Sequence, residues 1–342
     1  MSNRRPPSPR TSASVVPRAI TALLVVGPFV ALALTLWLFW GRAVNVTDLV
    51  MALVLYAATG HAVTVGFHRL FAHKGFKARR GVKIALAVVG SMAVQGSVVS
   101  WVANHRRHHV HSDRPGDPHS PHPEASGVPG VFRSFVHAHV GWLFQADDTP
   151  AERYAPDILR DADLVAIGRA FPVLAIASLA LPFAIGWALS GGPVGALTAL
   201  LWAGLLRMAL LHHVTWSVNS ICHLVGRRPF ASADQSGNVA VLAVLSFGES
   251  WHNLHHAYPT SARHGALPHQ VDSSAGLIRL FERLGWVSDV RWPTPERLAS
   301  LFVAQDRLPE APTPATAPAV PTAAIAPVVV RAARQPEPAR AR

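Results

Sequence analysis

The chain of 342 residues contains a single cysteine, Cys222. A lone cysteine cannot form an intrachain disulfide, which fits a reducing compartment, and it cannot ligate an iron–sulfur cluster by itself. Charged side chains are scarce at 15%, whereas hydrophobic residues make up 50%, so the composition is too apolar for an ordinary water-soluble enzyme. The net charge of +12 would suit nucleic acid or an anionic membrane surface, and the long apolar runs favour the membrane, with no nucleic-acid partner.

Four apolar runs are long enough to cross a hydrocarbon core of about 30 Å as helices. They cover residues 19–40, 47–67, 166–189 and 194–218. A short turn joins the first run to the second, and residues 190–193, Ser-Gly-Gly-Pro, separate the third from the fourth. The sequence therefore predicts an all-α membrane protein with four transmembrane helices in two hairpins.

Histidine is abundant, with 19 residues, and three short segments hold eight of them. Residues 104–109 and 251–256 both contain the spacing H-x-x-H-H, which puts three imidazoles on one face of an α-helix. Residues 68–73 have the spacing H-x4-H, roughly 140° apart on an α-helix, so this pair should lie across a helix end or bind two ions. Imidazole is a typical ligand of zinc, copper, iron and nickel, and the segments predict a polyhistidine site for more than one metal ion.

Histidines outside these segments are expected to be ordinary solvated or hydrogen-bonded residues. They are His61, His111, His119, His122, His137, His139, His212, His213, His264 and His269. His223 would be judged in the same way from its position alone.

The orientation of the spans follows from the basic residues near the first one. Arg4, Arg5, Arg10 and Arg18 precede it, and Arg42 alone occupies the next loop. Because short cytoplasmic segments carry the excess of Lys and Arg, both termini and the histidine segments are predicted to be cytoplasmic.

Residues 82–100 form a further apolar stretch. If this stretch crossed the membrane, the first two histidine segments would lie on opposite faces, so we predict a helix in the membrane interface. The basic N-terminus, residues 1–18, and the Pro/Ala-rich tail, residues 303–342, are predicted to be disordered around a membrane domain at 19–302.

The order of spans and histidine segments resembles the integral-membrane fatty acyl desaturases, most closely the stearoyl-CoA (Δ9) desaturases and their bacterial relatives. The resemblance covers about residues 45–295 and includes further stretches at 117–119, 139–143, 215–220, 248–251 and 261–265. It implies a cytoplasmic helical cap that holds a di-iron site, in a protein of the bacterial plasma membrane.

The resemblance also implies the ligands of the two iron ions, with the asparagine acting through a water molecule: His68, His73, His105, His108, His109, His223, His252, His255, His256 and Asn219. Glu249, Asp117 and His264 are expected to orient the ligands from behind. Gln95, Trp101 and Thr215 match the positions against which the family bends its acyl chain; on their own they would be judged ordinary packing residues.

Two positions depart from the animal enzymes, which have an Arg-Asp pair before the second histidine segment and a basic pair after the His-Val-Gly-Trp-Leu stretch. Here the first is Ala103-Asn104, and residues 144–148 are acidic. We expect either that CoA is bound differently from the animal enzymes or that the acyl carrier is not CoA. Candidates for phosphate contact are Arg79, Arg80, Arg106 and Arg107.

The implied activity is an O2-dependent acyl-CoA desaturase that introduces a cis double bond, at Δ9, into a saturated chain of about sixteen to eighteen carbons. Electrons must come from another protein (a ferredoxin, rubredoxin, cytochrome b5-like protein or flavin reductase), because the sequence has no dinucleotide-binding glycine pattern, haem attachment motif or cysteine cluster. The alternatives are a membrane di-iron fatty-acid hydroxylase or alkane monooxygenase, and a metal transporter. A transporter would place polar residues in mid-membrane, where the runs have few beyond Arg207, His212 and His213.

Overall fold

The computed structural model describes residues 15–38, 44–119, 121, 127–145 and 149–303. Most of both termini that were predicted to be disordered, and His122, lie outside these residues. The described chain is mostly helical, and its short strands β1 (Lys77–Ala78) and β2 (Val287–Ser288) form one antiparallel pair. The predicted all-α class is confirmed.

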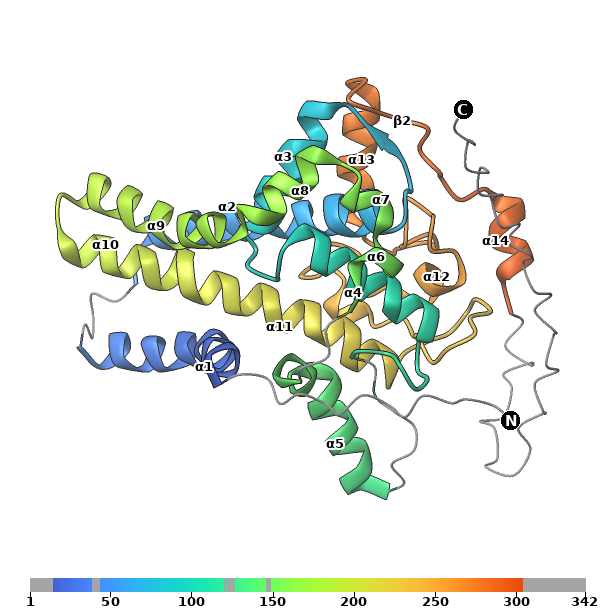
Figure 1. The fold of residues 1–342 in the computed structure, drawn as a ribbon, viewed down its shortest axis with the longest axis horizontal. Coiled ribbons are helices and arrows are strands. Elements are labelled where there is room, and N and C mark those ends of the chain that lie inside the picture. The colour runs from blue at the N-terminus through green and yellow to red at the C-terminus, as the bar shows by residue number, and fades with distance from the viewer. Residues whose placement is uncertain (1–14, 39–43, 120, 122–126, 146–148, 304–342) are drawn as a thin grey trace, which may run out of the picture. The chain divides into compact units, whose positions relative to one another are not determined.

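Four helical segments are long and apolar enough to span a membrane, as predicted. The second and fourth segments combine α-helix with other helix types, and the third begins directly after a break in the helix. Their elements are α1 (Val15–Leu38); α2 (Val46–His61) with the π-helix η1 (Ala62–Ala72); α9 (Phe171–Ser190); and α10 (Pro193–Ala199), η3 (Leu200–Leu206), α11 (Arg207–Ser220) and η4 (Ile221–His223). The last two segments run side by side as a hairpin (Figure 1).

The third span begins at Phe171, later than the apolar run suggested. The residues before it form a separate helix, α8 (Ala162–Arg169), and Pro172 occupies the first turn of α9, where a missing N–H costs nothing.

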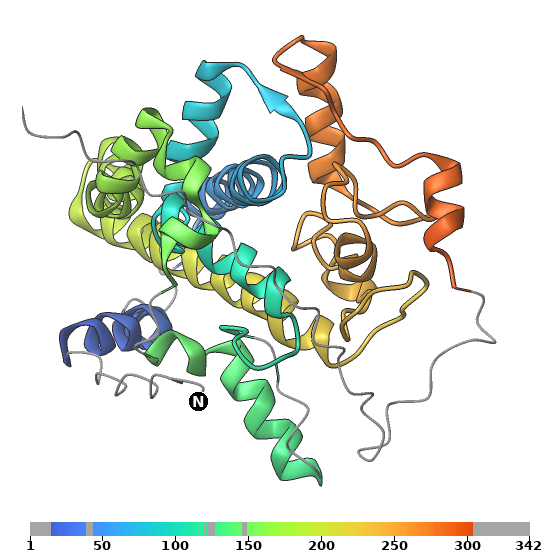
Figure 2. The same ribbon diagram turned by 45° about the vertical axis from the view of Figure 1, so that its right-hand side comes forward.

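The remaining elements make the predicted helical cap around the histidine segments. They are α3 (Arg80–Ser91), α4 (Val98–His111), α5 (Gly127–His139), η2 (Gly141–Phe144), α6 (Ala151–Tyr154), α7 (Pro156–Leu159), η5 (Ala240–Leu242), α12 (His252–Ala257), α13 (Ser273–Arg283) and α14 (Pro295–Leu301). Figure 2, in which α2 and η1 are seen nearly end-on, shows α4 below them and α12 with its loop to their right.

The stretch 82–100 is not one helix. α3 has 12 residues, about 18 Å at 1.5 Å per residue, which is too short to cross a membrane. The chain then turns through two residues with positive φ, Val94 and Gly96, before Ser97 caps α4. Because α3 ends there, the first two histidine segments can lie on the same side of the membrane. Its position in the interface stays a prediction.

Glycines allow α3 to pack closely on η1. A Cβ at Gly66 would lie 2.9 Å from Cβ of Leu86, and one at Gly90 would lie 2.6 Å from the ring of Phe67. Val65 and Phe67 are fully buried in this contact. The tight packing holds the end of η1, and the histidines on it, against the cap.

Candidate metal centre

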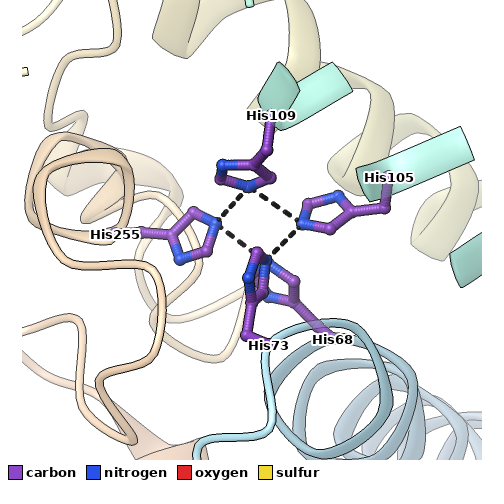
Figure 3. A group of neighbouring side chains, drawn as sticks. All are labelled: His68, His73, His105, His109 and His255. Atoms are coloured by element: carbon purple, nitrogen blue, oxygen red, sulfur yellow. Dashed lines mark hydrogen bonds between the residues drawn. The ribbon is translucent and has the colours of Figure 1, made fainter. Parts of the chain in front are cut away.

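Five imidazoles from three segments meet in one group, the first histidine cluster: His68, His73, His105, His109 and His255. One nitrogen of each lies within 4.8 Å of the others, and neighbouring Nε2 atoms are 2.7–3.1 Å apart. Figure 3 shows the rings pointing toward a common centre from η1, α4 and α12. Nitrogens at these distances fit a shared metal ion, since each neutral imidazole offers one lone pair.

Four imidazoles form a second histidine cluster: His108, His223, His252 and His256. The Nε2 atom of His252 lies 3.1 Å from that of His223 and 3.0 Å from that of His256. All nine histidines expected as ligands are therefore divided between two groups, five and four. The H-x4-H pair, His68 and His73, belongs to a single group, with His73 at the end of η1.

Carboxylates hold four of these rings from behind. Nδ1 of His108 donates to Asp117 at 2.9 Å, Nδ1 of His223 to Asp113 at 3.1 Å, and Nδ1 of His256 to Asp234 at 2.5 Å. A proton fixed on Nδ1 leaves Nε2 as the lone-pair donor that faces the cluster. The pair of His68 with Glu249 completes a pattern typical of metal-binding histidines.

Nδ1 of His68 pairs with Glu249, which is itself held by the buried guanidinium of Arg69 at 2.9 Å. Arg69 also pairs with Asp272 at 3.0 Å. His264 is fully buried beside them, with Nδ1 3.6 Å from Glu249. Glu249, Asp117 and His264 thus lie where orienting residues were expected, behind the clusters.

Sequence reasoning missed Asp113 and Asp234, because each is in a loop and meets its histidine only through the fold. It also judged His119 an ordinary histidine. His119 lies 4.6 Å, ring to ring, from His108 and groups with His108 and Asp117. The stretch 117–119, which contributes to the family resemblance, was the signal in the sequence that could have identified His119.

Burial favours the neutral form of several clustered imidazoles, whereas at His108 the neighbouring Asp117 outweighs burial and raises the pKa. Burial lowers the pKa of His105, His109, His252 and His255 well below the ordinary value, and the neighbouring rings lower it further. Burial also lowers the pKa of His256, to about 4, although its bond to Asp234 acts in the opposite direction. Neutral imidazole is the form that binds metal, so these rings are ready for an ion at neutral pH.

A cavity of about 530 Å³ opens beside the clusters, with apolar walls from α1, α9 and α11. Gln95, Trp101 and Thr215 line it together. The indole N–H of Trp101 donates to Gln95 at 3.3 Å, and the Gln95 amide donates to Thr215 at 3.0 Å. Trp101 also stacks on His105, 5.1 Å between ring centres. The three residues expected at an acyl-chain bend therefore form one hydrogen-bonded row next to the first cluster.

A smaller chamber of about 50 Å³ is also lined by two residues of this row, Trp101 and Thr215. It touches both clusters, through His68 and His252, and continues between α2, η1 and α11. Trp101, Thr215 and Asn219 line the cavity and the chamber alike. The two spaces share these three lining residues and His105 of the first cluster.

Two of the four arginines expected to contact phosphate are occupied by carboxylates. Arg106 makes a two-pronged pair with Asp157, at 2.5 and 3.0 Å, and Arg80 pairs with Asp163 at 2.7 Å. Arg106 also donates to the carbonyls of Phe71 and Ala72, so it ties η1 to the cap. Part of the acidic stretch, residues 146–148, is outside the described residues.

Comparison with known proteins agrees with this site. A family model described as fatty acid desaturase matches residues 47–270. The chain is 39% identical over 281 residues, 82% of its length and 86% of the relative's, to a hex-5-enoyl-(acyl-carrier protein) acetylenase of Moorena producens (strain JHB). It is 35% identical over 245 residues to an sn-1 stearoyl-lipid 9-desaturase of Anabaena variabilis (70% and 83% covered) and to an acyl-CoA C20 Delta5-desaturase of Anemone leveillei (70% and 72%). These matches show that the chain belongs to the fatty acid desaturase family, and that it is an oxidoreductase acting on fatty acids.

Proposed function

We propose that the protein binds two iron ions in its two histidine clusters and uses O2 to introduce a cis double bond, at Δ9, into a saturated acyl chain of about sixteen to eighteen carbons. The observation that carries the proposal is that a chamber lined by both clusters shares Trp101, Thr215 and Asn219 with the apolar cavity. Bound iron with O2 would supply the strong oxidant that removal of hydrogen from an unactivated methylene requires, which no side chain provides.

The donor set supports two ions over one. Nine imidazoles exceed the coordination number of a single iron, and the five-and-four division gives each ion its own ligands. Asn219 would complete the set through a water molecule, as the resemblance implies. The carboxylates behind His68, His108, His223 and His256 hold the lone pairs in place before metal arrives.

The row of Gln95, Trp101 and Thr215 would position the substrate. Its hydrogen bonds hold the three side chains beside His105, and we take this row as the corner at which an acyl chain would bend. A chain held bent at two neighbouring carbons is prepared for a cis product. The bond position then depends on the distance from the carrier to this corner, which supports a ruler measured from the carboxyl end.

The carrier that the resemblance implies is CoA, and acyl-CoA is the substrate that we propose first. Because Arg80 and Arg106 are each paired with a carboxylate, fewer cationic side chains remain to contact the phosphates of CoA. Among the relatives, the names include acyl-CoA, acyl-lipid and acyl-carrier-protein enzymes, and these are the alternatives. Electrons would come from a separate protein at the cytoplasmic face of a bacterial plasma membrane, where the site would lie.

The test is the fatty-acid profile of a desaturase-deficient host that expresses the chain, measured by gas chromatography–mass spectrometry of derivatised fatty acids. We expect cis-9 monounsaturated products, and none from His256→Ala. Thr215→Val, which removes the hydroxyl bonded to Gln95, should lower the rate or scatter the bond position. Its matched control is Thr59→Val, because the Thr59 hydroxyl bonds only its own helix, at Leu55. Alcohols in place of olefins would instead support the hydroxylase alternative.

A further inference from the structure

Part of the wall of the smaller chamber is a contact between two elements far apart in sequence. Gly60 on α2 and Phe247, in the loop before α12, both line it, as do Val63 and Thr64. Gly60 precedes His68 by eight residues, so this part of the wall lies no more than roughly 12 Å along the helix from the first cluster. Gly60 and Phe247 line the chamber and not the cavity, so a chain that enters from the cavity would reach them only inside the chamber.

Phe247 rests directly on bare backbone. A Cβ at Gly60 would lie 2.1 Å from Cε2 of Phe247 and 2.8 Å from Cζ, so no other residue at position 60 allows the ring to sit where it does. The ring also packs on His61, 4.2 Å between centres, and on Tyr56, at 5.4 Å. The Tyr56 hydroxyl donates to the Leu245 carbonyl at 2.8 Å, which fastens this loop to α2.

The backbone holds Phe247 in an unfavourable conformation. Its φ is +57°, in the left-handed region that a bulky residue seldom adopts, and Gly248 follows with φ +98°. Such strain collects at functional sites, where the surrounding structure holds it in place. A glycine at 247 would relieve the strain, yet this chain keeps a large ring there. Simple filling of the core does not account for a strained ring that also forms a chamber wall.

We propose that Phe247, seated on Gly60, is the stop for the methyl end of the acyl chain and sets the greatest chain length that the enzyme accepts. The inference rests on the proposed function, because it takes the chamber to be the methyl-end part of the substrate site. It adds a specificity residue that lies outside the four spans and outside the histidine segments. Removing the ring extends the chamber, while the corner at Trp101 and Thr215 still sets the bond position.

The experiment uses Phe247→Gly and Phe247→Leu in the full chain. The glycine variant removes the ring and the strain together, and the leucine variant keeps an apolar side chain if glycine weakens folding. Phe281→Leu is the matched control: Phe281 lines a separate groove with Ala57 and Val82 that does not include the histidine clusters. Each variant is expressed in the desaturase-deficient host fed with saturated fatty acids of even length from twelve to twenty-two carbons.

For both Phe247 variants we expect relatively more product from long substrates. The amount of the longest product, divided by the amount of the product that wild type prefers, should rise roughly tenfold, the effect of admitting about two more methylene groups. The bond should stay at the wild-type position counted from the carboxyl end, and Phe281→Leu should match wild type. Active Phe247 variants with the wild-type length distribution would overturn the proposal. If cells that express the wild-type protein make no olefinic product, the proposed function is contradicted. A binding measurement then tests whether Phe247 limits the chain length.

That measurement does not need turnover. Purified protein in detergent is heated with each saturated fatty acid, and the rise in Tm reports binding. In wild type the rise should stop growing beyond one chain length, and in Phe247→Gly the limit should move upward by about two carbons. The same limit in both proteins shows that Phe247 does not close the site.

Discussion

The backbone N–H of His73 donates to the carbonyl of His68 at 3.1 Å, a bond that spans five residues. This is the bond of a π-helix, which is rare and often marks a functional site. A π turn takes in more residues than an α turn, so residues five apart come to the same side. The two imidazoles therefore join one cluster, whereas an α-helix would turn them roughly 140° apart.

Because the clusters are separate, their metals should be lost separately. Wild-type protein from iron-sufficient cells is expected to hold about two iron ions per chain by elemental analysis. His73→Ala removes a ligand of the first cluster alone, and the content should fall to about one. Lys74→Ala is the control, since the exposed Lys74 only pairs with Asp157. Full occupancy in His73→Ala, or a single tightly held metal in wild type, would contradict the division into two sites.

The carboxylates that sequence reasoning missed give a sharper test. In Asp234→Asn and Asp113→Asn the amide no longer fixes the proton on the histidine Nδ1, and metal affinity should fall about 10–100-fold. Competition with a chelator measures the loss. Asp289→Asn, which breaks only an exposed pair with Lys77, should behave as wild type. Unchanged affinity in both cluster variants would mean that these bonds do not orient the ligands.

The sequence predicted the parts of the site that depend on local spacing. The H-x-x-H-H segments lie on short helices, so three imidazoles on one face could be expected from the sequence alone, and the four spans followed from apolar length. The H-x4-H segment could not be interpreted with certainty, because periodicity arguments assume 3.6 residues per turn and η1 does not have it.

Contacts between distant residues left no such pattern. Gln95 bonds Thr215 across 120 positions, and Asp234 reaches His256 from a loop without regular structure. The resemblance supplied the first pair and nothing supplied the second. Phe247 gave no signal either, because its strain and its contact with Gly60 exist only in the folded chain.

The metal-free protein should lose stability in mild acid. The pKa of His256 is lowered to about 4 by burial, against 6.5 in the unfolded chain, and burial also lowers the pKa of His105 and of His255. Between about pH 6.5 and 4 the unfolded state therefore binds more protons, so stability is complete above pH 6.5 and decreases as the pH falls through this window. Tm measured from pH 7.5 to 4 after chelation should fall steadily. A flat profile would show that these rings are not held neutral in the folded protein.

The near absence of cysteine makes the membrane topology directly testable. Cys222 is buried, so single cysteines added at exposed positions should react with a membrane-impermeant maleimide only where they face it. We expect Ser190→Cys, at the end of α9 beside the turn to the fourth span, to react in intact cells, because four spans that start in the cytoplasm place this turn outside. Lys77→Cys and Arg114→Cys, on either side of α3 and α4, should react only after the cells are opened.

These two positions decide whether the first two histidine segments can bind the same metal ion. α3 has 12 residues and turns back at Val94 and Gly96, so Lys77 and Arg114 must lie on one side if His68, His105 and His109 are to share a metal. Labelling of one of them in intact cells, and not the other, would place the first two histidine segments on opposite faces and rule out the first cluster.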